Sequence, residues 1–346
     1  MKKVFYAAVI LTACMFFASC DEAVQLIEEV QSNAASVIEE TAEAPVPTPT
    51  PAPVEEQTEE PPAAAAVEDE FVDVVVAVTC VKLRLGSKLN NLFPVLEIID
   101  ETVAETNPDI VVLSESIFTR MNPDGLKDAD KDTGKTEELG GPVFEAIAAK
   151  AMEHEIYIVF NVNAPYESKD EPGRLFYNSN FLVSPDGEII GRYDKNKLPP
   201  DEITLGLTPG TERPVFDIEI RGKTVTVGML ICYDFAREAY AEGEVKVAQT
   251  LAESGASLIL ASSIGDYVYE AVIDAANGGV FIAVAGQDRY MNDDYAASAI
   301  IAPDGSVILQ FTDRTGLPNQ SYEQMQYRKG QDGSFESVAL RLPVKK

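Results

Sequence analysis

Short apolar runs rich in β-branched residues recur along residues 71–346, and they constrain the fold more than any other feature of this sequence. Residues 72–81 (VDVVVAVTCV) and 109–115 (DIVVLSE) are two such runs, and runs of this length and composition are typical of buried strands. Helical spacing of apolar residues predicts helices over residues 89–106 and 142–154. Strands that alternate with helices indicate an α/β fold in which helices cover a sheet.

Hairpins interrupt this alternation. Pro185-Asp186-Gly187 and Pro303-Asp304-Gly305 are turn sequences between apolar runs. Antiparallel hairpins within a strand–helix alternation indicate mixed sheets, so we expect one layered α/β sandwich over residues 71–346. The other predicted elements are strands over residues 156–161, 176–183, 188–193, 215–220, 224–231, 257–261, 280–285 and 297–301 and helices over residues 236–254 and 267–277.

Residues 1–20 have the features of an export signal. Two lysines precede the apolar residues 4–18, a stretch that is too short for a stable membrane span and is typical of a signal peptide. The signal ends in FASC, with the cysteine at position 20, and this ending resembles the lipobox of bacterial lipoproteins. The resemblance implies that Cys20 is lipidated and becomes the new N-terminus. An ordinary signal peptide with a chance cysteine is the alternative.

Residues 21–70 are predicted to be a disordered tether. They contain fourteen acidic residues, seven prolines and no Lys or Arg. A segment of this composition cannot bury enough apolar surface to offset the entropy lost on ordering. Together with a lipid on Cys20, the tether predicts a folded domain held at the cell envelope, anchored to a bacterial membrane and outside the cytoplasm.

The charge of the chain narrows the set of partners. Its formal net charge is −30 at pH 7, which argues against binding nucleic acid or docking directly on anionic lipid. A small-molecule substrate, neutral or cationic, suits this surface. The membrane contact that we expect is the lipid on Cys20.

The sequence gives little support for a metal site or a cofactor site. His154 is the single histidine, so a zinc site lacks ligands, and no Gly-rich phosphate loop occurs. Residues 128–134 (DADKDTG) resemble a calcium loop, but Gly134 is one position late and Leu139 stands where the loop needs a glutamate. We predict no metal and no cofactor, with calcium at this acidic loop left as the alternative.

Cys232 is a candidate nucleophile. It follows the predicted strand over residues 224–231 and precedes a helix. At such a turn a side chain is exposed, and backbone N–H groups nearby can bind an oxyanion. A buried structural cysteine, or a disulfide with Cys80 in an exported protein, would also fit these residues.

Three short motifs together resemble the nitrilase superfamily of carbon–nitrogen hydrolases over residues 72–310. VVLSE ends in Glu115, GRYDKNKL carries Lys195 three residues before its leucine, and VGMLICYD carries Cys232. The resemblance implies a layered α-β-β-α sandwich with mixed sheets. It implies Glu115 as the general base, Lys195 as the catalytic lysine and Cys232 as the nucleophile.

The resemblance also implies further site residues. A second glutamate is often found shortly after the lysine, and Glu202 is the match, with Asp201 as its rival. The backbone N–H of Tyr233 would bind the oxyanion together with Lys195. Three positions depart from the family pattern and leave the specificity open: Ser114 replaces a proline, Ala236 an arginine and Gly286 an asparagine.

The function implied is hydrolysis of the C–N bond of a small amide or nitrile through a thioester on Cys232. Two alternatives remain: an N-acyltransferase that hands the same thioester to an amine, and a binding lipoprotein on a catalytically retired fold. Dimers are common in the family, so a monomer and a homodimer are both open. In the histidine-free mechanism, His154 is a helix-end residue that suits the helix dipole.

Overall fold

The computed structural model describes residues 70–82, 89–118, 136–166, 173–288, 297–311 and 333–345. The chain divides into two units, Met1–Ala66 and Val67–Lys346, and the described residues all belong to the second. The predictions for the signal peptide, for Cys20, for the tether up to residue 69 and for the acidic loop over residues 128–134 lie outside the described residues.

Seven strands in the described part of the chain form the first sheet. They are β1 (Phe71–Lys82), β2 (Ile110–Val112), β3 (Tyr157–Pro165), β4 (Phe176–Val183), β5 (Ile189–Asp194), β10 (Gln287–Asp288) and β13 (Gly333–Pro343). β1, β2 and β3 run parallel, and β4 and β5 follow as antiparallel neighbours. Two antiparallel steps return β5 to the direction of β2, so both strands end at the same edge of the sheet.

Six strands of the described residues form the second sheet. They are β6 (Val215–Ile220), β7 (Lys223–Ile231), β8 (Leu258–Ser262), β9 (Phe281–Ala285), β11 (Ser298–Ile301) and β12 (Val307–Phe311). β7, β8 and β9 are parallel, whereas β6 and the pair β11–β12 are antiparallel. Both sheets are therefore mixed, as the hairpin turns predict.

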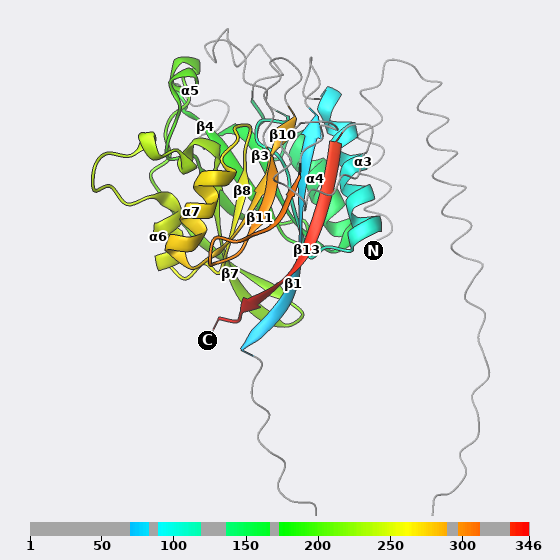
Figure 1. The fold of residues 1–346 in the computed structure, drawn as a ribbon. Coiled ribbons are helices and arrows are strands. Elements are labelled where there is room, and N and C mark those ends of the chain that lie inside the picture. Colours follow the sequence, from blue (N-terminus) through cyan, green and yellow to red (C-terminus); the bar gives the residue numbers. More distant parts are fainter. Residues whose placement is uncertain are drawn as a thin grey trace, which may run out of the picture. The chain divides into compact units, whose positions relative to one another are not determined.

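Helices cover the outer face of each sheet. α3 (Leu89–Thr106) and α4 (Pro142–His154) pack against the first sheet, and α6 (Val247–Glu253) and α7 (Val268–Gly278) against the second, with the sheets facing each other (Figure 1). This is the predicted α-β-β-α sandwich. None of the helices in the described ranges has the length and apolar character needed to cross a membrane.

β1 shows how the sequence pattern produces the layers. Val76 and Val78 join the core between the two sheets, while Ala77 joins the core beneath α3 and α4. Successive side chains of a strand point to opposite faces, so a strand buried on both faces needs apolar residues at every position. The continuous apolar run over residues 72–81 meets that requirement.

The predicted helix over residues 236–254 is shorter than expected. Two 3-10 turns, η3 (Cys232–Phe235) and η4 (Arg237–Ala239), come first, and α6 begins only at Val247. Gly243 has a φ of 80°, a left-handed conformation that interrupts a helix. β13 and the short helix α5 (Pro200–Leu205), which carries Glu202, were not predicted.

Candidate active site

Glu115 lies just beyond β2, at the edge where strands of both sheets end. Its side chain is fully buried. Oε1 accepts hydrogen bonds from Lys195 Nζ at 2.9 Å and from Asn178 Nδ2 at 2.7 Å. Oε2 accepts a hydrogen bond from the backbone N–H of Ile264 at 3.0 Å. Three donors from three different segments thus hold the carboxylate in one orientation.

Lys195 connects Glu115 to a second carboxylate. Its Nζ donates a hydrogen bond of 2.6 Å to Oε1 of Glu202, and both side chains are at most 1% exposed. Asp201, the alternative to Glu202, is exposed on α5. The structure therefore brings Glu202, and not Asp201, into contact with Lys195.

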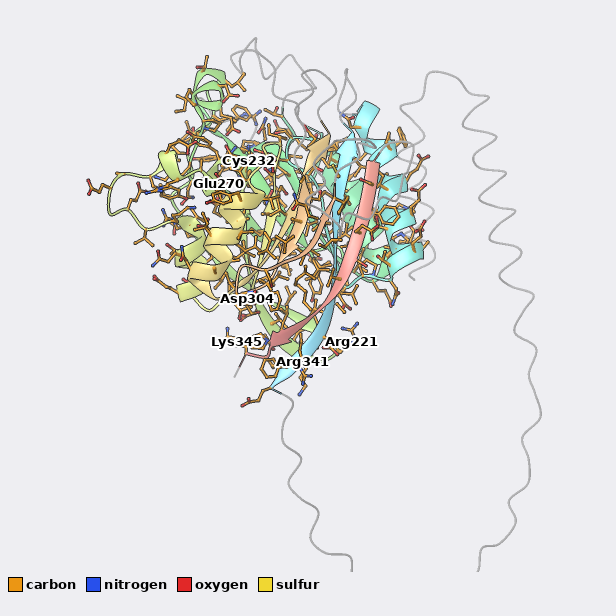
Figure 2. All side chains as sticks on the ribbon, in the orientation of Figure 1. Arg221, Cys232, Glu270, Asp304, Arg341 and Lys345 are labelled. Carbon is orange, nitrogen blue, oxygen red and sulfur yellow. The ribbon has the colours of Figure 1, made fainter. Side chains whose placement is uncertain are left out.

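Cys232 is the first residue after β7 and is 6% exposed. Its φ is 45°, a left-handed value that residues with a Cβ rarely adopt. Such strain persists only where the surroundings enforce it, and it is common at active sites. Figure 2 shows Cys232 at the end of the domain opposite Arg221, as expected from their positions at the two ends of β7.

The Asp234 carboxylate holds the turn that carries Cys232. Its Oδ2 accepts hydrogen bonds from the Tyr193 hydroxyl at 2.7 Å and from the backbone N–H of Ile231 at 3.0 Å. Its Oδ1 accepts one from the backbone N–H of Lys197 at 2.9 Å. Asp234 thus ties the segment after Lys195 to the segment that bears the thiol.

The Cys232 thiol lies beside the charged groups. Its pKa is raised to about 12, first by burial and then by the Glu115 carboxylate, while Lys195 lowers it. Hydrogen bonds with the Ile264 backbone and the Ser263 side chain also lower it. A thiol with this pKa is protonated at neutral pH, and the thiolate is the nucleophile. For Cys232 to act as a nucleophile, a neighbouring base would have to take its proton, and Glu115 is a carboxylate close enough to act on the pKa of the thiol.

The pKa values of Glu202 and Lys195 are shifted as well. Burial raises the pKa of Glu202 to about 7, against the lowering effect of Lys195, and the nearby Glu115 raises it further. Burial lowers the pKa of Lys195, but the charges of Glu115 and Glu202 outweigh burial and hold that pKa well above its usual value. Lys195 therefore stays protonated at neutral pH, whereas Glu202 changes charge near this pH.

Tyr233 occupies the second position of η3. The first N–H groups of a helix have no partner inside the helix, and the backbone N–H of Tyr233 is one of these groups. Its side chain lines a cavity of about 510 Å³, together with Leu198, Ile203 and Leu207. The residue after Cys232 thus borders a largely apolar cavity beside α5.

Two of the three departures from the family pattern contact each other. The Ser114 hydroxyl donates a short hydrogen bond to the backbone carbonyl of Gly286, and it also accepts a hydrogen bond of 3.3 Å from the backbone N–H of Val81. A proline at position 114 could make neither contact, because it has no hydroxyl. Ser114 therefore joins the segment before Glu115 to β1 and to the segment after β9.

The sequence motifs missed the site residue Asn178. Its Nδ2 donates to Glu115 at 2.7 Å and to Glu202 at 3.2 Å. A signal was present, because Asn178 and Asn180 occupy alternate positions of the otherwise largely apolar strand β4, and both are buried. Buried polar residues on one face of a strand need partners on that face.

His154 lies away from this cluster, at the end of α4. Its Nε2 contacts Oδ1 of Asp100 at 2.6 Å. These two residues and Glu153 bring potential metal ligands within 4.8 Å of one another. The Lys150 ammonium, however, already pairs with Asp100 at 2.6 Å and with Glu153 at 2.9 Å. Both carboxylates of this group are therefore already paired with a cation.

The two described cysteines do not form the disulfide considered from the sequence. Cys80 and Cys232 are both buried, and neither takes part in a disulfide among the described residues. Cys80 belongs to β1, whereas Cys232 follows β7 of the other sheet. Cys232 therefore has a free thiol.

Comparisons with known proteins agree with this fold. The family model described as carbon-nitrogen hydrolase matches residues 76–317. Saccharomyces cerevisiae Nit3, a member of branch 10 of the nitrilase superfamily, superposes with a TM-score of 0.58 at 17% identity, over 77% of this chain and 90% of its own. No curated protein matches the chain significantly.

An amidase from Nesterenkonia sp. is also similar, with a TM-score of 0.56 at 17% identity over 77% of this chain and 90% of the amidase. A mutant of the Nesterenkonia sp. AN1 amidase carries the acetamide moiety of fluoroacetamide on its active-site cysteine. It has a TM-score of 0.57 at 17% identity, over 80% and 93% of the two chains. At this identity, the likeness establishes the fold.

Proposed function

Because the chain belongs to the carbon-nitrogen hydrolase family, we propose that it hydrolyses the C–N bond of a small amide or nitrile through a thioester on Cys232. One observation carries the proposal: Glu115 and Lys195 form an ion pair with both side chains 0% exposed, beside the Cys232 thiol. Desolvating such a pair costs several kcal/mol. Costs of this kind are concentrated at sites of chemistry.

For an amide substrate, acylation begins with the Cys232 proton. Glu115 takes that proton while the sulfur attacks the carbonyl carbon, and the carbonyl π electrons move onto oxygen. Lys195 and the backbone N–H of Tyr233 stabilise this oxyanion, with about 3–4 kcal/mol for each well-placed donor. When the tetrahedral intermediate collapses, the C–N bond breaks, and protonated Glu115 gives its proton to the leaving amine.

Deacylation uses the same groups. Glu115, again a carboxylate, takes a proton from water, and the hydroxide attacks the thioester carbon. Collapse of the second intermediate breaks the C–S bond, releases a carboxylic acid and returns the proton to Cys232. Oε2 of Glu202 is buried and has no hydrogen-bond partner among the described residues. We assign it the role of accepting an N–H of the substrate amide.

The solved relatives support small aliphatic amides as first probes. The acetamide moiety on the cysteine of the Nesterenkonia amidase is covalently bound, and another variant of that enzyme was solved with butyramide. Similar chemistry in this chain would need a thiol that can be acylated and a neighbouring base. Cys232 and Glu115 meet that description.

The test is a panel of amides and nitriles with the wild type and Cys232→Ala in parallel. Intact-mass spectrometry after rapid quenching should show the acyl group on the wild type and not on Cys232→Ala. Added hydroxylamine separates hydrolysis from acyl transfer, since a transferase needs the amine for turnover. A wild type that neither turns over nor acylates on any member of the panel would leave the binding-lipoprotein alternative.

The location is a separate proposal, supported by the FASC ending at Cys20 and by the acidic, proline-rich residues 21–70. We propose that lipid on Cys20 anchors the enzyme to a bacterial membrane, with the hydrolase domain outside the cytoplasm. Two or more acyl chains are needed for stable anchoring. Cys20→Ala should move the protein to the soluble fraction, while retention in salt-washed membranes would contradict the anchor.

A further inference from the structure

Three buried asparagines form a hydrogen-bonded row on one face of the first sheet. Asn161 of β3 and Asn180 of β4 are cross-strand partners, and Asn178 lies two residues before Asn180. Residues two apart in a strand share a face. All three side chains are at most 1% exposed. The row runs from the catalytic carboxylates to β7 of the second sheet.

The hydrogen bonds fix which way each amide points. Oδ1 of Asn161 accepts the backbone N–H of Ser116 at 2.8 Å, so its Nδ2 faces the other two asparagines. That Nδ2 donates to Oδ1 of Asn178 at 2.8 Å and to Oδ1 of Asn180 at 3.0 Å. Nδ2 of Asn180 donates to the backbone carbonyl of Leu230 at 3.2 Å. Hydrogen bonds to backbone groups at both ends of the row, from Ser116 and to Leu230, therefore fix the orientation of its side-chain amides.

The orientation of Asn178 follows from that of Asn161. Because Oδ1 of Asn178 is occupied by Asn161, both N–H groups of Asn178 face Glu115 and Glu202. Turning the Asn178 amide by half a turn would place its oxygen against two carboxylates and its N–H groups against those of Asn161. Both contacts would be repulsive, so the amide is locked.

We propose that Asn178 is a positioning residue that holds the carboxyl groups of Glu115 and Glu202 beside each other, and that Asn161 fixes its amide for this task. Lys195 bridges the same two oxygens, at 2.9 Å and 2.6 Å. A single ammonium cannot balance two carboxylates. Asn178 supplies two further donors without adding a charge. The inference rests on the proposed function for the roles of the two glutamates.

The charged and titratable groups around Glu202 give the direction of the expected effect. Lys195 faces it from the segment after β5 and Glu115 from the segment after β2, while the Cys232 thiol adjoins Lys195. The hydrogen bond from Asn178 lowers the pKa of Glu202, which burial has raised to about 7. Removing Asn178 should raise that pKa and shift the loss of activity on acidification to higher pH.

The experiment compares the pH dependence of kcat/KM in Asn178→Ala and Asn180→Ala from about pH 5 to 10. This range extends roughly two to three pH units to either side of the pKa of Glu202. Asn180 belongs to the same row and is equally buried but contacts neither carboxylate. We expect the acid limb of kcat/KM to move up by about one pH unit or more in Asn178→Ala, the size expected for losing a hydrogen bond to a charged group. Asn180→Ala should lower the melting temperature and leave the limb unmoved.

A second readout does not depend on turnover. The rate at which iodoacetamide alkylates Cys232, measured by peptide mass mapping, also depends on Lys195, which lowers the pKa of the thiol and is held by the ionised Glu202. The lower inflection in the pH profile of the alkylation rate should move in Asn178→Ala by the same amount as the acid limb of kcat/KM. In Asn178→Ser, which keeps one donor, it should move by a smaller amount. If the wild type hydrolyses no amide but this inflection moves, the proposed function fails and the positioning role stands.

Two results would overturn the role of Asn178. One is an unchanged lower inflection in both Asn178→Ala and Asn178→Ser, whatever happens to the rate. The other is an equal shift in Asn180→Ala, because that residue does not touch the carboxylates. Asn178→Ser also serves if Asn178→Ala fails to fold.

Discussion

The backbone N–H of Ile264 donates a hydrogen bond of 3.0 Å to Oε2 of Glu115, across 149 residues of sequence. Glu115 follows β2 of the first sheet and Ile264 follows β8 of the second. The same N–H also acts on the Cys232 thiol. This contact therefore joins the two sheets at the point where the proposed base and nucleophile meet, and it leaves Oε1 of Glu115 to Lys195 and Asn178.

The three principal residues should act as one unit. Cys232→Ala, Glu115→Gln and Lys195→Ala should each lower turnover at least about a hundredfold with the fold retained, because each removes the nucleophile, the base or an oxyanion donor. The triple variant should be little worse than the singles. Steady-state kinetics with circular dichroism measures this, and near wild-type turnover in any single variant would refute its role.

The two neighbouring acids on α5 should differ. Glu202→Gln should impair turnover far more than Asp201→Asn, because Glu202 contacts Lys195 at 2.6 Å whereas Asp201 is exposed. Asp201→Asn is the matched control, with the same change of charge on the same helix. Parallel kinetics on the two variants decides the matter, and the reverse ranking would move the role to Asp201.

Activity and stability should depend on pH in opposite directions. The pKa of Glu202 rises from 4.5 to about 7 on folding, so the folded state binds more protons than the unfolded state between these values. Stability from this group is therefore present at low pH and declines as pH rises from about 4.5 to about 7. Turnover, which needs the ionised form to hold Lys195, should fall as pH drops below about 7.

Chemical unfolding of the wild type and Glu202→Gln over that pH range checks this, together with the kcat profile of the wild type. The difference in unfolding free energy between the two proteins isolates Glu202 from Asp234, whose pKa burial raises to about 6. A difference that stays constant across the range would show that Glu202 does not titrate there.

The turn at Cys232 should weaken when Asp234 loses a donor. Tyr193→Phe removes the 2.7 Å hydrogen bond to Oδ2 of Asp234 and leaves a buried carboxylate oxygen less satisfied. We expect a loss of about 1–3 kcal/mol in unfolding free energy and a several-fold loss of turnover. Denaturant unfolding and kinetics on the same preparation measure both, and unchanged values would mean that the hydrogen bond from Tyr193 does not contribute to holding the turn.

His154 should be dispensable for chemistry. It lies at the end of α4 and contacts Asp100, outside the cluster around Glu115. His154→Gln should keep turnover within a few-fold and cost on the order of 1 kcal/mol of stability, because a helix terminus favours a basic residue there. Kinetics of the folded variant tests this. A thousandfold loss without unfolding would require a cysteine–histidine pair and would end the assignment of Glu115 as base.

Much of the fold follows from local pattern. The apolar run over residues 72–81 specifies a strand buried on both faces, and α4 spans Pro142–His154 because proline suits a first helical turn and the apolar spacing is regular. The prediction of one helix over residues 236–254 was wrong. Its apolar spacing is helical, but Gly243 has a φ of 80°, which interrupts a helix. β13 was not predicted, although it pairs with β1 along eleven register positions. The pairing of two strands so far apart in the sequence cannot be recognised from the residues of either strand alone.

The motifs around Glu115, Lys195 and Cys232 are each short and continuous in the sequence. The sequence by itself therefore determined which residues are candidates. Glu202 could not be separated from Asp201 by sequence, since the two are adjacent and chemically alike. Only the tertiary structure decided between them, because the direction in which α5 presents its residues depends on packing. The same holds for Asn178: its contacts cross 63 and 24 residues of sequence, and hydrogen bonds at such separations exist only once the strands are in register.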